Sequence, residues 1–187
     1  MKNAKNILWA LPLFSILFFT ACEKEDPIVP NEEELITTLI YTLTPVGGGS
    51  PVEFRFTDLD GDGGDAPVIT NGTLSANTTY SGVITLLNET ESPADVISEE
   101  VANEAEEHQL FFTVTTANAT IAYADADADG NPIGLTTTMT TTGTSTGTLM
   151  VTLRHEPNKT ATGVSSGDIA NAGGETDIEV TFDVTVQ

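Results

Sequence analysis

Alternation of apolar and polar residues is the clearest pattern in this chain. Over residues 177–187, five apolar side chains alternate with polar ones, which is the period of a β-strand with one buried face. Similar alternation, or a short β-branched and aromatic run, predicts seven more strands, at residues 35–44, 52–57, 80–87, 110–115, 119–124, 133–141 and 148–155. Clusters of Gly, Asn, Asp and Pro separate them. The pattern predicts an all-β fold, an Ig-like or transthyretin-like antiparallel β-sandwich of about eight strands.

One short helix is expected among these strands. Ser92 can serve as an N-cap, and Pro93 suits the first helical position. Ile97, Val101 and Ala105 then recur every four residues, which gives a thin apolar stripe. We expect a surface helix over residues 93–106, laid across one sheet edge.

The N-terminal residues have the layout of a secretion signal. Lys2 and Lys5 precede an apolar run over residues 7–19, and small residues follow at Ala21 and Cys22. The run is shorter than the roughly 20 residues that span a bilayer. An ordinary cleaved signal or an N-terminal membrane anchor is the alternative. Cys22 is the only cysteine of the chain and so has no disulfide partner within it.

The tetrapeptide at residues 19–22, Phe-Thr-Ala-Cys, resembles a lipobox, with Phe19 in place of the usual Leu. This resemblance implies that residues 1–21 are removed and that Cys22 carries the lipid anchor. The following Lys24, Glu25 and Asp26 resemble the export tag of Bacteroidota lipoproteins that face the cell exterior; an acidic stretch in a tether is the alternative. We therefore expect an outer-membrane lipoprotein with a flexible acidic tether at residues 22–34 and a single domain at residues 35–187.

Charge narrows the possible partners. Without residues 1–21 the chain keeps four basic residues against 28 acidic ones, a net charge of −24. Nucleic acid and anionic lipid headgroups would be repelled, so we expect neither as a ligand. A cysteine nucleophile, a His-Glu-x-x-His motif and a phosphate-cradling glycine loop are all missing from the sequence of the mature chain, which favours a protein that is not an enzyme.

Two acidic loops have the alternating carboxylates and glycines that suit Ca²⁺, which prefers flexible oxygen-rich sites. Neither is an EF-hand, because the twelfth position would be Ile69 or Thr136 rather than Glu. An acidic hairpin turn is the alternative for both. The candidate calcium ligands are Asp58, Asp60, Asp62 and Asp65 in the first loop, and Asp125, Asp127 and Asp129 in the second.

A polar pole is expected at one end of the domain. The strands over residues 110–115, 119–124, 133–141 and 148–155 are joined by short connections, which predicts an antiparallel meander. Such a meander would gather the second acidic loop with Glu107, His108, His155 and Glu156. A ligand, an ion or a basic residue of a partner could bind there; the alternative is that polar loops simply cap the sheet. Lone histidines are more often structural than metal ligands.

The segments LLNETESPADVISEE, EEHQLFF, DADADGNPIGL, TLRHEPNK and GDIANAGGETDIEVTF resemble a family of small flavobacterial lipoproteins. These often carry the label of a type 1 periplasmic binding fold, which is two α/β lobes and does not suit so short and β-rich a chain. The resemblance implies a lipoprotein. We expect a non-catalytic, surface-exposed binding module, stabilised by calcium, that contacts an envelope protein or an extracellular ligand. The alternative is a binding protein for a small solute or a metal.

Overall fold

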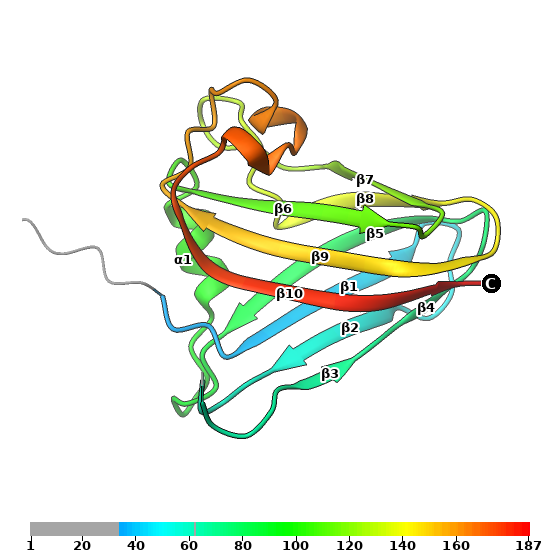
Figure 1. The fold of residues 1–187 in the computed structure, drawn as a ribbon, viewed down its shortest axis with the longest axis horizontal. Coiled ribbons are helices and arrows are strands. Elements are labelled where there is room, and N and C mark those ends of the chain that lie inside the picture. The colour runs from blue at the N-terminus through cyan, green and yellow to red at the C-terminus, as the bar shows by residue number, and fades with distance from the viewer. Residues whose placement is uncertain (1–33, 62) are drawn as a thin grey trace, which may run out of the picture. The chain divides into compact units, whose positions relative to one another are not determined.

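The computed structural model describes residues 34–61 and 63–187, which form a sandwich of two β-sheets (Figure 1). The predicted lipid anchor Cys22, the export tag Lys24, Glu25 and Asp26, and the acidic Asp62 lie outside the described residues. The six-stranded sheet has the order β3-β2-β1-β5-β8-β7, and the four-stranded sheet has the order β4-β10-β9-β6. The strands are β1 (Thr38–Pro45), β2 (Val52–Thr57), β3 (Val68–Thr70), β4 (Thr73–Leu74), β5 (Thr79–Leu87), β6 (His108–Thr115), β7 (Ala119–Tyr123), β8 (Thr136–Thr141), β9 (Ser145–His155) and β10 (Glu175–Val186).

The predicted β-sandwich is confirmed, and each of the eight expected strands is present. The two additional strands, β3 and β4, have only three and two residues, too few to show an alternating pattern. Alternation along β10 buries Ile178, Val180 and Phe182 between the sheets. Phe182 meets Phe54 of the opposite sheet edge-on, with ring centroids 5.6 Å apart. The core is therefore built from the inward positions that the strand period marks.

The helix differs from its prediction. Helix α1 (Ile97–Asn103) is shorter than residues 93–106, and its N-cap is Val96, with no side-chain cap bond. The backbones of Asn88 and Asp95 exchange two 3.0 Å hydrogen bonds, so Asp95 is held in a bridge and cannot enter a first helical turn. Ile97 and Val101 are buried in the main core, and the helix contacts β5, an interior strand. The helix is a surface helix with a thin buried stripe, as predicted, but it closes one end of the sandwich and does not lie across a sheet edge (Figure 1).

The predicted four-strand meander is also wrong. Strand β6 pairs with β9, whereas the hairpin of β7 and β8 belongs to the other sheet, beside β5. Thr116, in the connection after β6, has a φ of 60°, a sharp local bend where the chain crosses from one sheet to the other. Alternation defines which face of a strand is buried, but it does not define the strand's neighbour.

Two short 3₁₀ helices, η1 (Val164–Ser166) and η2 (Ile169–Asn171), lie in the long connection between β9 and β10. Val164 is buried there beside Phe111, on the outer face of the four-stranded sheet. No helix within residues 34–61 and 63–187 has the length and apolar character needed to cross a membrane.

Gly82 of β5 leaves room for a buried hydrogen bond between its two neighbouring strands. Tyr41 Oη and Thr137 Oγ1 lie 2.7 Å apart. A Cβ on Gly82 would overlap Thr137 Oγ1 and lie 2.7 Å from Tyr41 Cε2. Glycine is thus required at this position for packing.

We predict that Gly82→Ala lowers the free energy of unfolding by about 1–3 kcal/mol, because the added methyl group overpacks this contact. Ser81→Ala, at the exposed neighbouring position, is the control and should change it by less than about 0.5 kcal/mol. Denaturant unfolding measures both. Equal stability of the two variants would contradict the close approach.

Candidate metal centre

The pairing of β6 with β9 brings the two histidines of the chain into direct contact. His108 begins β6, His155 ends β9, and the two residues are cross-strand partners. Their rings stack with centroids 4.6 Å apart and an angle of 18° between their planes. Both occupy inward positions, as Leu110 and Leu153 do further along the same strands. A pair 47 residues apart in sequence therefore forms one site inside the end of the sandwich.

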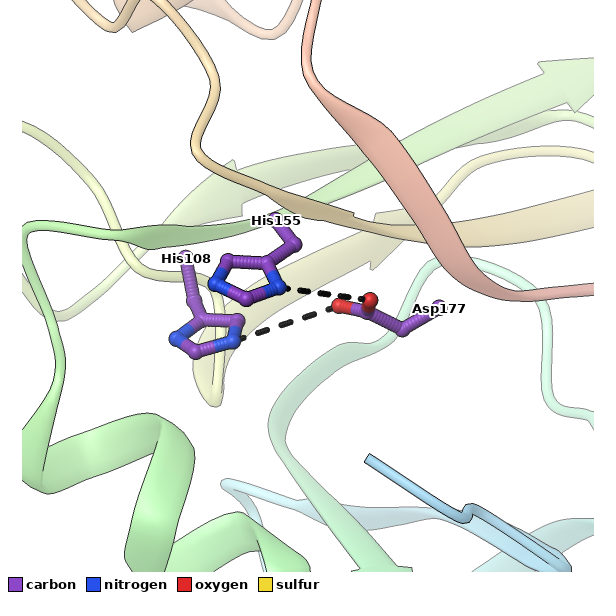
Figure 2. Close-up of side chains that lie close together, drawn as sticks. All are labelled: His108, His155 and Asp177. Carbon is purple, nitrogen blue, oxygen red and sulfur yellow. Dashed lines mark ion pairs between the residues drawn. The ribbon is translucent and has the colours of Figure 1, made fainter. Parts of the chain in front are cut away.

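A β-bulge adds a carboxylate to this pair. Thr176 is opposite Arg154 and Ile178 is opposite Leu153, so Asp177 is the extra residue of β10. A bulge re-aims a side chain that strict alternation would send to the other face. The Asp177 side chain has no exposed surface, and its Oδ1 lies 3.8 Å from His155 Nδ1 while its Oδ2 lies 4.0 Å from His108 Nε2 (Figure 2).

Glu34, just before β1, supplies a second carboxylate. Its Oε1 lies 4.0 Å from His108 Nε2, and its side chain is 10% exposed. Burial, followed by the charges of Glu100, Asp177 and Glu104, raises the pKa of Glu34 to about 7. The prediction assigned Glu34 to the tether, and it did not include Asp177 among the site residues.

The orientation of His108 is fixed by the backbone. Its Nδ1 lies 3.2 Å from the carbonyl oxygen of Glu104. A carbonyl only accepts, so Nδ1 carries the hydrogen and donates. Burial, the largest influence, lowers the pKa of His108, which favours the neutral ring. In that state Nε2 is a bare lone pair, and it has no hydrogen-bond partner while it faces two carboxylates.

This arrangement suits a metal cation. Metal-binding histidines typically donate their second ring N–H to a carbonyl or carboxylate, which fixes the tautomer and aims the other nitrogen at the ion. His108, His155 and Asp177 each offer one ligand atom, and these atoms lie within 4.8 Å of one another. Zinc ligands at about 2.0–2.2 Å from the ion lie about 3.4 Å apart at the tetrahedral angle. The three ligand atoms lie up to 4.8 Å apart, so they would have to approach one another by up to about 1.4 Å to hold one ion.

The structure brings together the four residues of the predicted polar pole. The backbone N–H of Glu156 donates to the carbonyl oxygen of Glu107 at 2.6 Å, and Glu107, His155 and Glu156 also have ligand atoms within 4.8 Å of one another. Glu107 and Glu156 are exposed, on the outer side of the histidine pair. The pole forms through the pairing of β6 with β9, and the incorrect meander placed its two histidines at the same end only because both arrangements are antiparallel.

The second acidic loop uses its carboxylates for internal contacts. Asp125 accepts from the backbone N–H groups of Gly134 and Thr136, both at 2.7 Å. Asp127 Oδ1 accepts from the N–H groups of Asp129 and Asn131. Its Oδ2 accepts from Lys159 Nζ at 2.9 Å, inside the protein. The Lys159 ammonium group thus already balances the Asp127 carboxylate, where the prediction placed a calcium ion.

Lys159 also donates to the carbonyl oxygen of Ala105, just beyond α1. Burial by itself would raise the pKa of Asp127, but the hydrogen bond from Lys159 and those from the backbone hold it below the usual value. The side chains of Lys159 and Asp127 are only 4% and 1% exposed. Lys159 therefore fastens the long connection before β10 to both α1 and the second acidic loop.

The first acidic loop lies beside the histidine site. Asp58 Oδ1 accepts from the N–H of Gly61 at 2.9 Å, and Asp60 Oδ2 accepts from the N–H of Asp65 at 2.8 Å, contacts typical of a tight acidic turn. Asp58 and Asp60 line a pocket of about 620 Å³ that also contains Glu34 and Asp177. Among the described residues, the three-residue groups with metal-binding geometry do not include an aspartate of either loop. Calcium binding to these loops stays a prediction.

No protein-family model matches the chain, and neither a curated protein nor a solved structure matches it. The resemblance to flavobacterial lipoproteins therefore stays an expectation.

We predict that Lys159→Met lowers the free energy of unfolding by about 3–5 kcal/mol, because it leaves the Asp127 carboxylate buried without its cation. Arg55→Met is the matched control: it removes a partly exposed pair with Glu89 and should cost less than about 1 kcal/mol. Adding Asp127→Asn to Lys159→Met should recover part of the loss. Denaturant unfolding would contradict the buried-pair account if both single variants lost equal stability.

Proposed function

We propose that this chain is an exported lipoprotein, anchored through Cys22, whose sandwich domain is a non-catalytic binding module for a divalent transition metal. His108, His155 and Asp177 are the proposed ligands, and Glu34 is the fourth. The observation that carries the proposal is the buried His108 Nε2, which has no hydrogen-bond partner and is aimed at two carboxylates by the bond from Nδ1 to Glu104.

The ligand types favour a transition metal over calcium at this position. Imidazole nitrogen suits Zn²⁺, Cu²⁺ and Ni²⁺, whereas Ca²⁺ takes oxygen ligands. Two imidazoles with one or two carboxylates match the ligand sets of zinc. Burial is the largest cause of the raised pKa of Glu34, and the ion would relieve the next one, the crowding of negative charge.

The burial of the proposed ligands favours a site that binds an ion over a catalytic site. The side chains of His108 and Asp177 have no exposed surface, and that of His155 is 7% exposed. An ion bound by these three groups would lie next to the pocket that Glu34 and Asp177 line. A centre of this kind is typical of a protein that binds a metal ion or is stabilised by one.

The anchoring half of the proposal rests on the sequence. The signal-like residues 1–21, the lone Cys22 and the acidic run after it favour export and lipid attachment. Lys24, Glu25 and Asp26 favour display on the outer face of the outer membrane, where the binding domain would meet extracellular ions.

Zn²⁺ should bind the detergent-purified full-length protein with one ion per chain and raise its melting temperature, because the ion binds the folded state. His155→Gln and Asp177→Asn should each weaken binding at least tenfold, about 1.4 kcal/mol. Isothermal titration calorimetry and thermal unfolding measure these effects. Asp183→Asn, an exposed carboxylate on β10, is the control and should bind as the wild type does. Failure of the wild type to bind Zn²⁺, Ni²⁺ or Cu²⁺ would overturn the metal-binding proposal.

Cys22→Ala should leave the protein unprocessed or release it from the membrane fraction, because the proposed acyl chains would have no attachment point. Ser15→Ala, within the apolar run, is the control and should be processed normally. Fractionation followed by detergent extraction measures the distribution. Retention of Cys22→Ala in the membrane at the wild-type size and level would refute the lipoprotein proposal.

A further inference from the structure

A pocket that is open to the surface shares two carboxylate residues with the candidate metal centre. Its volume is about 620 Å³, and its walls come from the chain before β1, from the end of β2 with the loop that follows, and from the start of β10. These segments are adjacent because Thr38 at the start of β1 pairs with Thr57 at the end of β2. Glu34 and Asp177 belong both to the pocket and to the histidine site. The pocket therefore borders the metal centre.

The lining of the pocket is acidic. Among the described residues, thirteen line the pocket, and no Lys, Arg or His is one of them. Five carry carboxylates, namely Glu34, Asp58, Asp60, Asp177 and Glu179. The outer carboxylates each have one oxygen in an internal hydrogen bond: Asp58 and Asp60 accept from loop N–H groups, and Glu179 Oε2 accepts from Thr152 Oγ1 at 3.0 Å.

Glu34 is different from the outer carboxylates. Its side chain is nine-tenths buried, and its Oε2 has no hydrogen-bond partner, although its Oε1 faces His108. A buried carboxylate oxygen without a donor is costly unless a cation compensates it. Glu34, a residue of both the pocket and the site, thus has one oxygen toward His108 and another without a donor.

We infer that this pocket is the passage through which a divalent cation reaches the histidines, with Asp58, Asp60 and Glu179 as an outer capture site and Glu34 as the group that passes the ion inward. The inference rests on the proposed metal-binding function and adds the route to it. A pocket lined by charges of one sign, with low-dielectric walls, focuses the field and raises the local cation concentration. Oxygen ligands hold a partly hydrated ion loosely, and imidazole nitrogen then holds a transition metal more firmly.

The route predicts a kinetic effect that the inner ligands do not share. In the double variant Asp58→Asn and Asp60→Asn, the association rate constant for Zn²⁺ at low salt should fall about tenfold, within the range known for electrostatic steering. The inner ligands are unchanged, so the chain should still bind one Zn²⁺. The difference from the wild type should shrink in high salt, because screening weakens attraction between separated charges.

The experiment is stopped-flow transfer of Zn²⁺ from a fluorescent indicator to the detergent-purified full-length protein. Glu53→Gln with Asp183→Asn is the matched control, since it removes two exposed carboxylates outside the pocket and should slow association less than threefold. Glu34→Gln should slow association and also weaken equilibrium binding. Equal association rates in the two double variants would overturn the passage and leave the metal centre standing. A wild type that takes up no Zn²⁺ would overturn both.

Discussion

The burial of a carboxylate is the constraint on which the end of this sandwich depends. Asp177 has no exposed side-chain surface, and a buried carboxylate is tolerated only with compensating charge or hydrogen-bond donors. The bulge in β10 sends Asp177 inward, toward the place where antiparallel pairing has already stacked His108 on His155. Backbone geometry therefore concentrates two imidazoles and a carboxylate in an interior that the rest of the core fills with apolar side chains.

The two buried carboxylates Asp127 and Asp177 have different surroundings. Asp127 is also buried, and Lys159 provides it with a permanent cation at 2.9 Å. At Asp177 the neighbouring groups are imidazoles, and burial lowers the pKa of His108 so that this ring contributes little positive charge of its own. Asp127 thus belongs to a closed ion pair, whereas the site around His108 also contains an imidazole nitrogen without a hydrogen-bond partner. The lone pair of His108 Nε2 is oriented as in a histidine that binds a metal ion.

Local patterns were sufficient to predict most of the fold but less of the site. Alternation depends on near neighbours in sequence, so the eight longer strands and the sandwich could be predicted. His108 and His155 were predicted to lie at the same end because the strands that carry them were expected to run antiparallel. Strand partners could not be predicted, because both sheets accept the same pattern. Asp177 was missed because a bulge breaks the period of two on which the prediction relied. Glu34 was missed because it stands in a polar run, and the partner of Asp127 is 32 residues away in sequence.

The few basic side chains of the described residues lie away from the acidic pocket. Among the residues that the structure describes, the basic side chains are Arg55, Arg154 and Lys159, and none of them lines the acidic pocket. Arg55 is paired with Glu89, Lys159 with Asp127, and Arg154 donates to the carbonyl oxygen of Gly174. Glu34 Oε2, which has no hydrogen-bond partner among the described residues, is therefore left to a proton or to an ion from solution. A proton on Glu34 relieves one charge, whereas a divalent ion relieves two and also uses the His108 lone pair, so the geometry favours the metal.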